Sequence, residues 1–269
     1  MKKILELAYN YMNEYVKTFY SDDKDEMLGI ATKEEHTGYV TKNCRDLAEH
    51  LHLNEHDVQL AELIGLLHDI GRFRQWQVYH TFVDGDSEDH ANLGLKVIVD
   101  LPFYKLLAAK DQELLLFAIG NHNKKEIVKT KSAKKLLFAK IIRDADKLDI
   151  YRVLEPYLDA TKEFGLKLKF SPATHEDRFA AGFLEKFVNG EQVDYRLIET
   201  QNDRKLVRLM WVYDVNFSWT LQRIRDRGFI CKIISSLPDN EMVKQGVERL
   251  NTYVDIKCAT NDLPVNLGE

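Results

Sequence analysis

Apolar side chains recur at intervals of three and four residues along most of this 269-residue chain. The first such stretch carries Ile4, Leu7, Ala8, Tyr11, Tyr15 and Phe19. This spacing places apolar side chains on one face of an α-helix, whereas a half-buried β-strand would alternate them. No alternation of useful length is found elsewhere in the sequence. The chain is therefore predicted to be all-α, a bundle of packed amphipathic helices.

Capping residues and breaks divide the first half of the chain. Asn54 is a suitable N-cap for a helix that continues to His68, and Gly71 is expected close to the C-cap of that helix. Residues 72–88 are predicted to be irregular, with Ser87 as the cap of the helix that follows.

The second half shows longer helical patterns around one polar stretch. Ser132 is predicted to open a long helix. Residues 160–178 are polar and are predicted to form a loop. Residues 195–236 hold few helix breakers, so one or two long helices are expected there. Residues 240–257 predict a last amphipathic helix.

The length suits one substantial domain, or a core with a helical extension. The character of the sequence changes after Tyr151. Residues 1–152 are accordingly predicted to form the core with its N-terminal helix, and residues 153–269 a helical extension packed on it. The two parts are expected to make one compact unit.

Charge and cysteine content limit the expected partners and location. The formal net charge of −5 gives no general attraction to nucleic acid or to an anionic membrane. No segment approaches the roughly 20 apolar residues of a membrane helix, and Glu6 interrupts the apolar pattern that a signal peptide would need. Three distant cysteines, Cys44, Cys231 and Cys258, favour a reduced, cytoplasmic location over a disulfide framework.

Several ionisable residues stand at the ends of apolar runs. His68 and Asp69 follow the run at 63–67, and His122 follows the run at 114–119. Burying an unpaired carboxylate such as Asp69 is costly, so a metal ion or a cationic partner is expected beside it. Imidazoles and carboxylates suit borderline and hard divalent metals. The candidate ligands along the chain are His36, His68, Asp69, His90, His122 and Asp146.

Three segments carry a resemblance to a known family. They are Glu35-His36-Thr37-Gly38-Tyr39-Val40, Leu67-His68-Asp69-Ile70-Gly71-Arg72 and Asp144-Ala145-Asp146-Lys147-Leu148-Asp149. Their sequence and spacing resemble the HD superfamily of metal-dependent phosphohydrolases over residues 30–152. The resemblance implies an HD-domain helical bundle, in agreement with the helical periodicity.

The resemblance also implies a ligand set for one metal ion: His36, His68, Asp69 and Asp146. Asp146 matches the family's Ala-Asp-x-Leu pattern, and Asp144, two residues away, is the alternative ligand. The carboxylate that does not bind would orient a ligating histidine or pair with Arg143 or Lys147.

Two further histidines are placed like those of the binuclear members of the superfamily. In that subset the Asp of the His-Asp pair bridges two metal ions, and His90 and His122 would then bind the second one. Alternatively, His90 caps its helix and His122 binds substrate. One or two divalent ions are therefore implied, and Mn, Mg, Fe, Co, Ni and Zn all remain open because availability also decides which metal fills such a site.

The reaction implied by the resemblance is hydrolysis of a nucleotide or another small phosphate ester by metal-activated water. His68 and Asp69 would be catalytic, with Asp69 holding the metal or accepting a proton from the water. Arg72 follows one helical turn later, and its planar guanidinium suits two phosphate oxygens. A surface ion pair is the other interpretation of Arg72.

Two other classes of function stay open at this point. The same ligand set resembles di-iron members of the superfamily that use O₂ on a polyol or a phosphonate. A non-catalytic, ligand-sensing HD domain is the third interpretation. The segment 195–236 would serve a homodimer interface or would simply pack on the core.

Overall fold

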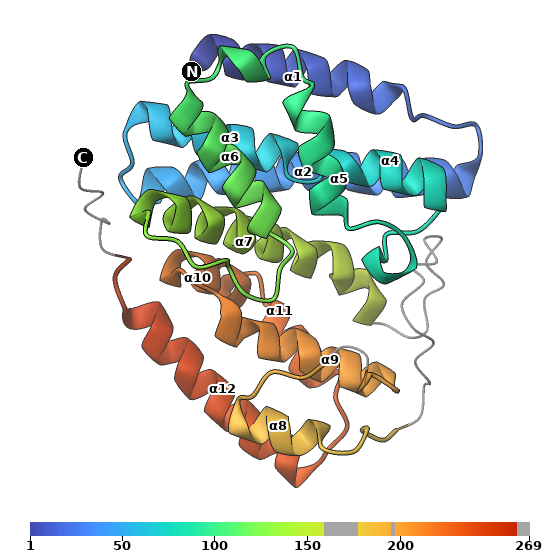
Figure 1. The fold of residues 1–269 in the computed structure, drawn as a ribbon. Helices are drawn as coiled ribbons and strands as arrows, with labels where there is room; N and C mark the ends of the chain where they lie inside the picture. The colour runs from blue at the N-terminus through green and yellow to red at the C-terminus, as the bar shows by residue number, and fades with distance from the viewer. Residues whose placement is uncertain (159–176, 195–196, 263–269) are drawn as a thin grey trace. The chain divides into compact units, whose positions relative to one another are not determined.

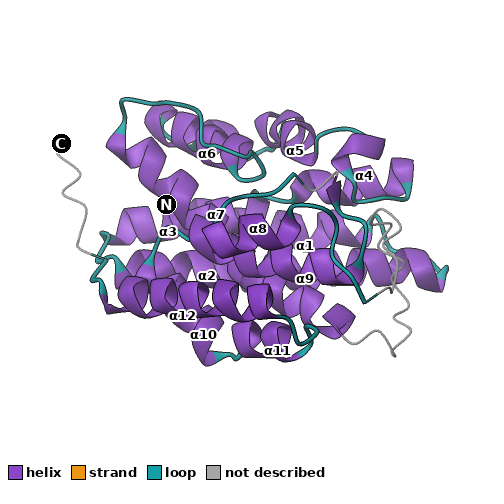
Figure 2. Cartoon of the chain, turned by 90° about the horizontal axis from the view of Figure 1, so that it is seen from below, coloured by secondary structure: helices purple, strands orange, loops and turns teal. Residues whose placement is uncertain are grey.

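The computed structural model describes residues 1–158, 177–194 and 197–262. These residues form helices joined by loops, without a β-strand among them (Figure 2). This confirms the predicted all-α class. The α-helices, labelled in Figure 1, are α1 (Lys2–Lys17), α2 (Lys24–His50), α3 (Glu55–Leu67), α4 (Ile70–Tyr79), α5 (His90–Val99), α6 (Ala109–Asn121), α7 (Ala133–Leu154), α8 (Phe183–Asn189), α9 (Gln201–Met210), α10 (Ser218–Asp226), α11 (Phe229–Ser235) and α12 (Glu241–Ala259).

The described residues divide into two compact units. The first extends from Met1 to Ile150, and the second runs from Tyr151 to Asp262. The predicted packing of the C-terminal residues onto the core stays a prediction.

The first unit is built around α2 and α3. These two helices pack against each other, α3 also contacts α1 and α6, and α4 lies against both α2 and α5. Asn43 on α2 donates a hydrogen bond to the backbone carbonyl of Ala145, 3.2 Å away, and so ties α7 to α2. Four helices and the α3–α4 junction thus converge in one buried region.

Two predicted helix starts are confirmed by their hydrogen bonds. The Asn54 side chain accepts a hydrogen bond from the backbone N–H of Asp57 at 3.0 Å, as an N-cap should. Ser132 Oγ accepts from the backbone N–H of Lys135 at 3.2 Å, where α7 begins. The start of α5 was assigned wrongly, because Asp89 rather than Ser87 is its N-cap.

The prediction around Gly71 is also wrong. Helix α3 ends at Leu67, and Gly71 lies inside α4, so much of the stretch predicted to be irregular is helical. A Cβ atom at Gly71 would stand 2.4 Å from the backbone oxygen of His90 and 2.6 Å from the backbone nitrogen of Gly94. This glycine therefore allows the backbones of α4 and α5 to approach closely. A single sequence does not distinguish such a glycine from one at a helix end.

The second unit consists of short helices. Helix α12 packs against α8 and α10, and α9 contacts α8 and α11. The prediction of one or two long helices over residues 195–236 is wrong, because α9, α10 and α11 are separate. Gly228, with φ of +74°, takes the left-handed conformation between α10 and α11 that favours glycine. The predicted loop at 160–178 lies almost entirely outside the described residues.

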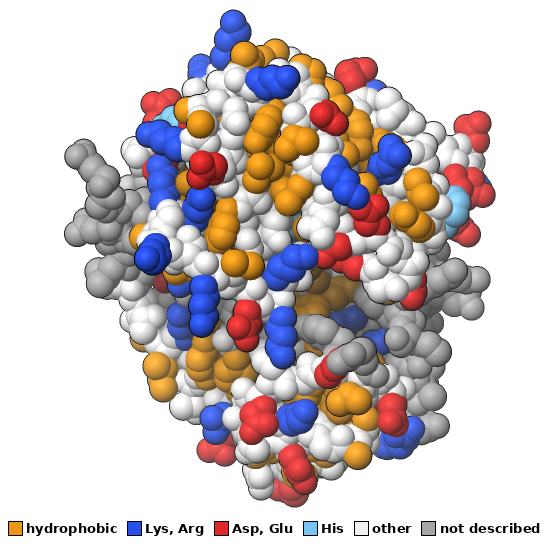
Figure 3. Space-filling view, viewed as in Figure 1, with side chains coloured by type: hydrophobic (Ala, Val, Ile, Leu, Met, Phe, Trp, Pro, Cys, Tyr) orange, Lys and Arg blue, Asp and Glu red, His pale blue; other side chains and the backbone are white. Residues whose placement is uncertain are grey.

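The surface carries both signs of charge. Lys and Arg side chains are interspersed with Asp and Glu on the face shown in Figure 3. Within the part of the chain that the structure describes, no helix combines the length and apolar character needed to cross a membrane.

Candidate metal centre

Six predicted ligands come together in the first unit. His36 is provided by α2, His68 and Asp69 by the α3–α4 junction, His90 by the first residue of α5, His122 by the C-cap of α6, and Asp146 by α7. The four histidines and Asp69 are buried. The Asp146 side chain keeps 16% of its surface exposed and is the most exposed of the six.

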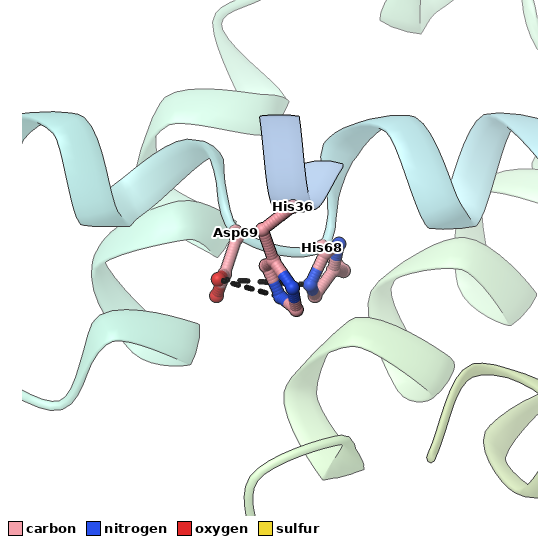
Figure 4. Close-up of side chains that lie close together, drawn as sticks. All are labelled: His36, His68 and Asp69. Carbon is pink, nitrogen blue, oxygen red and sulfur yellow. Dashed lines mark ion pairs between the residues drawn. The ribbon is translucent and has the colours of Figure 1, made fainter. Parts of the chain in front are cut away.

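One half of the centre, here named the α2 side, comprises His36, His68 and Asp146. Oδ2 of Asp69 lies 3.6 Å from Nε2 of His36 and 3.6 Å from Nε2 of His68 (Figure 4). Oδ1 of Asp146 lies 3.1 Å and 3.9 Å from the same two nitrogens. Two imidazole nitrogens and two carboxylates therefore surround one small volume.

The other half, here named the α5 side, comprises His90 and His122. Their Nε2 atoms lie 3.4 Å and 3.7 Å from Oδ1 of Asp69, the carboxylate oxygen that the α2 side does not use. Asp69 thus belongs to two groups of ligand atoms, one with His36 and His68 and one with His90 and His122.

The Nδ1 atoms of all four imidazoles are occupied by acceptors. His68 donates to the Gly65 carbonyl at 2.8 Å, and His122 donates to the Ile119 carbonyl at 2.7 Å. His36 Nδ1 lies 2.7 Å from an oxygen of Asp149, and His90 Nδ1 lies 2.7 Å from an oxygen of Asp84. Because a carbonyl or an ionised carboxylate can only accept, each Nδ1 carries a proton, and a ring in its neutral form presents an Nε2 lone pair to the centre.

This arrangement of lone pairs fits a bound cation. The Nε2 atoms of His36 and His68 are buried and have no hydrogen-bond partner among the described residues. The Nε2 atoms of His90 and His122 face each other at 2.9 Å, and two lone pairs at that separation need a positive species between or beside them. Carboxylate or carbonyl partners at Nδ1 are also how metal-binding imidazoles are usually oriented. The donor set therefore fits one or two divalent metal ions.

The pKa shifts of His68 and His90 agree with this role. Burial lowers the pKa of His68 to about 4, and burial with the nearby Arg72 lowers the pKa of His90 to about 4. Both rings are therefore neutral, as a metal ligand must be, near pH 7. Burial and Lys33 lower the pKa of His36, but its two carboxylate partners, Asp146 and Asp149, outweigh them and raise it above the ordinary value.

The carboxylates of the centre are held ionised. Burial alone would raise the pKa of Asp69, yet Lys33 and the neighbouring imidazoles keep it well below its usual value. Hydrogen bonding to His36 likewise outweighs burial and lowers the pKa of Asp146. Both groups thus keep the negative charge that a divalent ion requires.

The alternative residues on α7 occupy other positions. Asp146 is the carboxylate that faces the imidazoles, whereas Asp144 is fully buried and Lys147 is partly exposed on the same helix. The roles predicted for Asp144 and Lys147 stay predictions. Asp149, one turn beyond Asp146, is the α7 carboxylate that contacts Nδ1 of His36.

Arg72 is already held by protein acceptors. Its Nη1 atom donates to Gln75 Oε1 at 2.7 Å, to the Phe82 carbonyl at 2.6 Å and to Asp84 Oδ1 at 3.0 Å. Its Nε atom lies 3.6 Å from Oδ1 of Asp69. These contacts join the guanidinium to the carboxylate that orients His90, which the sequence alone did not indicate.

Three residues of the centre were missed in the sequence: Lys33, Asp84 and Asp149. Lys33 Nζ lies 2.7 Å from Oδ2 of Asp69, and its signal is its position one helical turn before His36. Asp149 shows the same helical spacing from Asp146. Asp84 belongs to a short 3₁₀ helix (Asp84–Asp86), and no periodic pattern relates it to His90.

Comparison with known proteins adds one finding. Residues 34–151, which contain all six candidate ligands, match the family model described as the HD domain. The match supports the HD-domain superfamily. Members of this superfamily are generally metal-dependent hydrolases. The match covers less than half of the chain. Searches of curated proteins and of solved structures found no match.

Proposed function

We propose that this protein is a metal-dependent phosphohydrolase or phosphodiesterase that acts on a nucleotide or another small phosphate ester. The observation that carries the proposal is the convergence of four Nε2 lone pairs on the two oxygens of Asp69. The HD-domain match at residues 34–151 supports the same reaction class. We favour two ions because the second pair of histidines, His90 and His122, faces the other oxygen of Asp69.

The residues divide naturally between two ions. The α2 side with Oδ2 of Asp69 would hold one ion, and the α5 side with Oδ1 would hold the other. When bound, such ions lower the pKa of water and neutralise charge on a phosphate. Asp69 and Asp146 supply the negative charge, and the neutral imidazoles fix the positions.

Lys33 is the cation best placed to meet the substrate. Its side chain is 18% exposed, whereas Asp69 beside it is buried. An ammonium group on a flexible stem can exchange a carboxylate partner for a phosphate oxygen. Arg72 is proposed to fix Asp84, and through it His90, because three protein acceptors already hold its Nη1 atom.

The proposal is tested with purified full-length protein. The chain is stripped with a chelator, reloaded separately with Mn, Mg, Fe, Co, Ni or Zn, and assayed against nucleotides and simple phosphate esters. We expect hydrolysis in the loaded protein and its loss in His68→Ala. The control is His80→Asn, which changes an exposed histidine outside the centre.

Two results would contradict the proposal. Hydrolysis that persists undiminished in His68→Ala would show that the phosphate ester is cleaved elsewhere. Iron-dependent oxygen consumption with a polyol or phosphonate, in a protein that hydrolyses no phosphate ester, would assign the same ligands to an oxygenase.

A further inference from the structure

Gln75 on α4 is a fully buried polar residue outside the set of candidate ligands. Removing a side-chain amide from water is unfavourable unless its donors and its acceptor find partners in the protein. An apolar side chain of similar size would occupy a buried helix position without that cost. The reason for a glutamine at this position must therefore lie in its contacts.

The amide of Gln75 is hydrogen-bonded on both sides. Its oxygen Oε1 accepts from Nη1 of Arg72 at 2.7 Å. Its nitrogen Nε2 donates to Oδ1 of Asp84 at 2.9 Å, to Oγ of Ser87 at 2.8 Å and to the Glu88 carbonyl at 2.9 Å. A guanidinium can only donate, whereas an ionised carboxylate and a carbonyl can only accept, so these partners fix which end of the amide is the nitrogen.

These partners require a group that accepts on one side and donates on the other. A glutamate would place a second negatively charged oxygen against Asp84. A methionine would offer no hydrogen bond to Arg72 and none to the Glu88 carbonyl. The amide thus satisfies a donor on α4 and several acceptors in the segment between α4 and α5.

Asp84 is the residue through which Gln75 reaches the metal centre. The Asp84 side chain is 32% exposed, so its direction depends on the donors around it. Arg72 donates to Oδ1 at 3.0 Å beside Gln75, and Nδ2 of Asn123 lies 3.3 Å from Oδ2. The two oxygens are thereby held 2.9 Å and 2.7 Å from Nδ1 of His90.

The same amide also anchors the backbone just before α5. Ser87 and Glu88 stand two and three residues before His90, the first residue of that helix. One side chain on α4 therefore contacts both the carboxylate that meets the His90 ring and the segment that leads into the His90 backbone.

We propose that Gln75 is a positioning residue of the α5 side, which holds Asp84 so that the carboxylate fixes the His90 ring with its proton on Nδ1. Metal-binding imidazoles are usually oriented by a partner at the other ring nitrogen, and that partner must itself be held in place. The inference rests on the proposed function only in taking His90 as a metal ligand, and it requires no particular substrate.

The first test uses the metal-free full-length protein, so its result does not depend on hydrolysis. With ¹⁵N-labelled histidine, NMR at neutral pH distinguishes protonated from unprotonated ring nitrogens, and His90→Gln assigns the signals of His90. We expect Nδ1 of His90 to carry its proton in the wild type. In Gln75→Glu it should lose that proton in part, because the new carboxylate drives Asp84 away from the ring.

The second test measures metal binding by titration of the metal-free protein with Co²⁺, followed by its absorption. Gln75→Glu should weaken the α5-side ion by about 10–100-fold and leave the α2-side ion in place. The experiment reports affinity rather than turnover, so a protein without phosphohydrolase activity would still give an answer.

The matched control is Gln112→Glu. Gln112 on α6 likewise donates to two backbone carbonyls of the preceding segment, those of Tyr104 and Leu107, but at the opposite end of the helix from His122. This variant should lower the free energy of unfolding without changing the His90 signals or either Co²⁺ affinity.

A double variant separates positioning from a general packing defect. If Gln75 acts through Asp84, most of its effect should disappear once Asp84→Asn has removed the carboxylate. The fold-changes of the two single variants in α5-side affinity should therefore not multiply in the Gln75→Glu, Asp84→Asn protein. Full multiplication would show that Gln75 acts independently of Asp84 and would overturn the proposal.

Unchanged His90 signals in Gln75→Glu would also overturn it. If the wild type binds a single Co²⁺ ion, the two-ion assignment fails, and the NMR result alone decides the role of Gln75. If Gln75→Glu does not fold, Gln75→Met replaces it in both measurements, because it removes the amide without adding a charge. The same changes in the His90 signals and in α5-side affinity are expected there, and their absence would refute the role.

Discussion

The two sides of the metal centre share Asp69 but are supported differently. On the α2 side, Nδ1 of His36 is held by Asp149, which is fully buried on α7. On the α5 side, Nδ1 of His90 is held by Asp84, whose side chain is 32% exposed in a short 3₁₀ helix. The α2 side also has a second carboxylate, Asp146, beside its imidazoles. We therefore expect the α2 side to bind its ion more tightly and the α5 side to depend on the segment between α4 and α5.

The largest effect is expected when the shared residue is changed, because both sides then lose a ligand. Asp69→Asn should abolish binding at the α5 side and weaken it at the α2 side. A catalytic ion is worth several kcal/mol, so hydrolysis should fall by about 10³-fold or more. Metal content per chain and kcat/KM are measured together. Unchanged metal content would refute the shared role of Asp69.

Variants of Asp149 and Asp84, the carboxylates that hold His36 and His90, test the two sides individually. Asp149→Asn should weaken the α2-side ion, and Asp84→Asn the α5-side ion, each by about 10–100-fold, because an amide orients the imidazole less well than a carboxylate does. Titration of the stripped protein with Co²⁺, followed by its absorption, resolves the tight and the weak step. The tight step should move in Asp149→Asn and the weak step in Asp84→Asn.

The matched control for this pair is Asp89→Asn. Asp89 lies in the same segment as Asp84 and pairs with Lys124, yet its role is to cap α5, which asparagine performs equally well. Both Co²⁺ steps should stay in place in this variant. Displacement of the same step in Asp149→Asn and Asp84→Asn would mean that the two sides are not distinct.

A smaller effect is expected from the contact between α4 and α5. Gly71→Ala places a methyl group against the backbone of His90 and Gly94, so the helices must separate at a cost of about 1–3 kcal/mol. Gly38→Ala on α2, where no atom lies within 4 Å of the new Cβ, should instead stabilise the chain by about 0.5–1 kcal/mol. Urea unfolding of the metal-free proteins measures the free energy of unfolding of both variants. If Gly71→Ala is stabilised as Gly38→Ala is, the close contact between α4 and α5 at Gly71 is refuted.

The last effect is the dependence of stability on pH in the metal-free chain. His68 and His90 have pKa values near 4 when folded and an ordinary value of 6.5 when unfolded. Between those values the unfolded chain binds more protons, so these residues lower the stability as the pH falls from 6.5 to 4. His36, with its raised pKa, acts in the opposite direction and loses its contribution as the pH rises through its folded pKa.

His68 and His90 together outweigh His36. The melting temperature of the metal-free protein should therefore fall on acidification below pH 6.5. His90→Gln should reduce the slope of that fall. A melting temperature that rises between pH 6.5 and 4 would be incompatible with neutral His68 and His90.

The sequence was sufficient for the features that repeat or that stand at helix ends. Helical spacing predicted the class, and the position of His68-Asp69 after a buried run predicted a cluster of ligands that the structure brings together. The sequence was insufficient where a contact joins two segments that do not belong to one helix, because helical spacing does not relate their residues. Asp84 reaches His90 through a 3₁₀ turn, and Gly71 meets the backbone of α5, so neither role is visible without the packing of the helices.

Arg72 shows the same limit. The sequence left open whether its guanidinium contacts phosphate oxygens or forms a surface ion pair. In the structure its Nη1 atom donates to Gln75, to the Phe82 carbonyl and to Asp84. Its role toward a substrate stays a prediction, because a single sequence does not show where these acceptors lie.

The charged side chains around the imidazoles have an electrostatic consequence. Four carboxylates, Asp69, Asp84, Asp146 and Asp149, gather here with two basic side chains, Lys33 and Arg72, so these six side chains have an excess of two formal negative charges. Two divalent ions would invert that excess to two positive charges, equal and opposite to a phosphate monoester dianion. The bare protein should therefore repel the molecules that its loaded form attracts, so that metal supply controls the entry of substrate as well as its turnover.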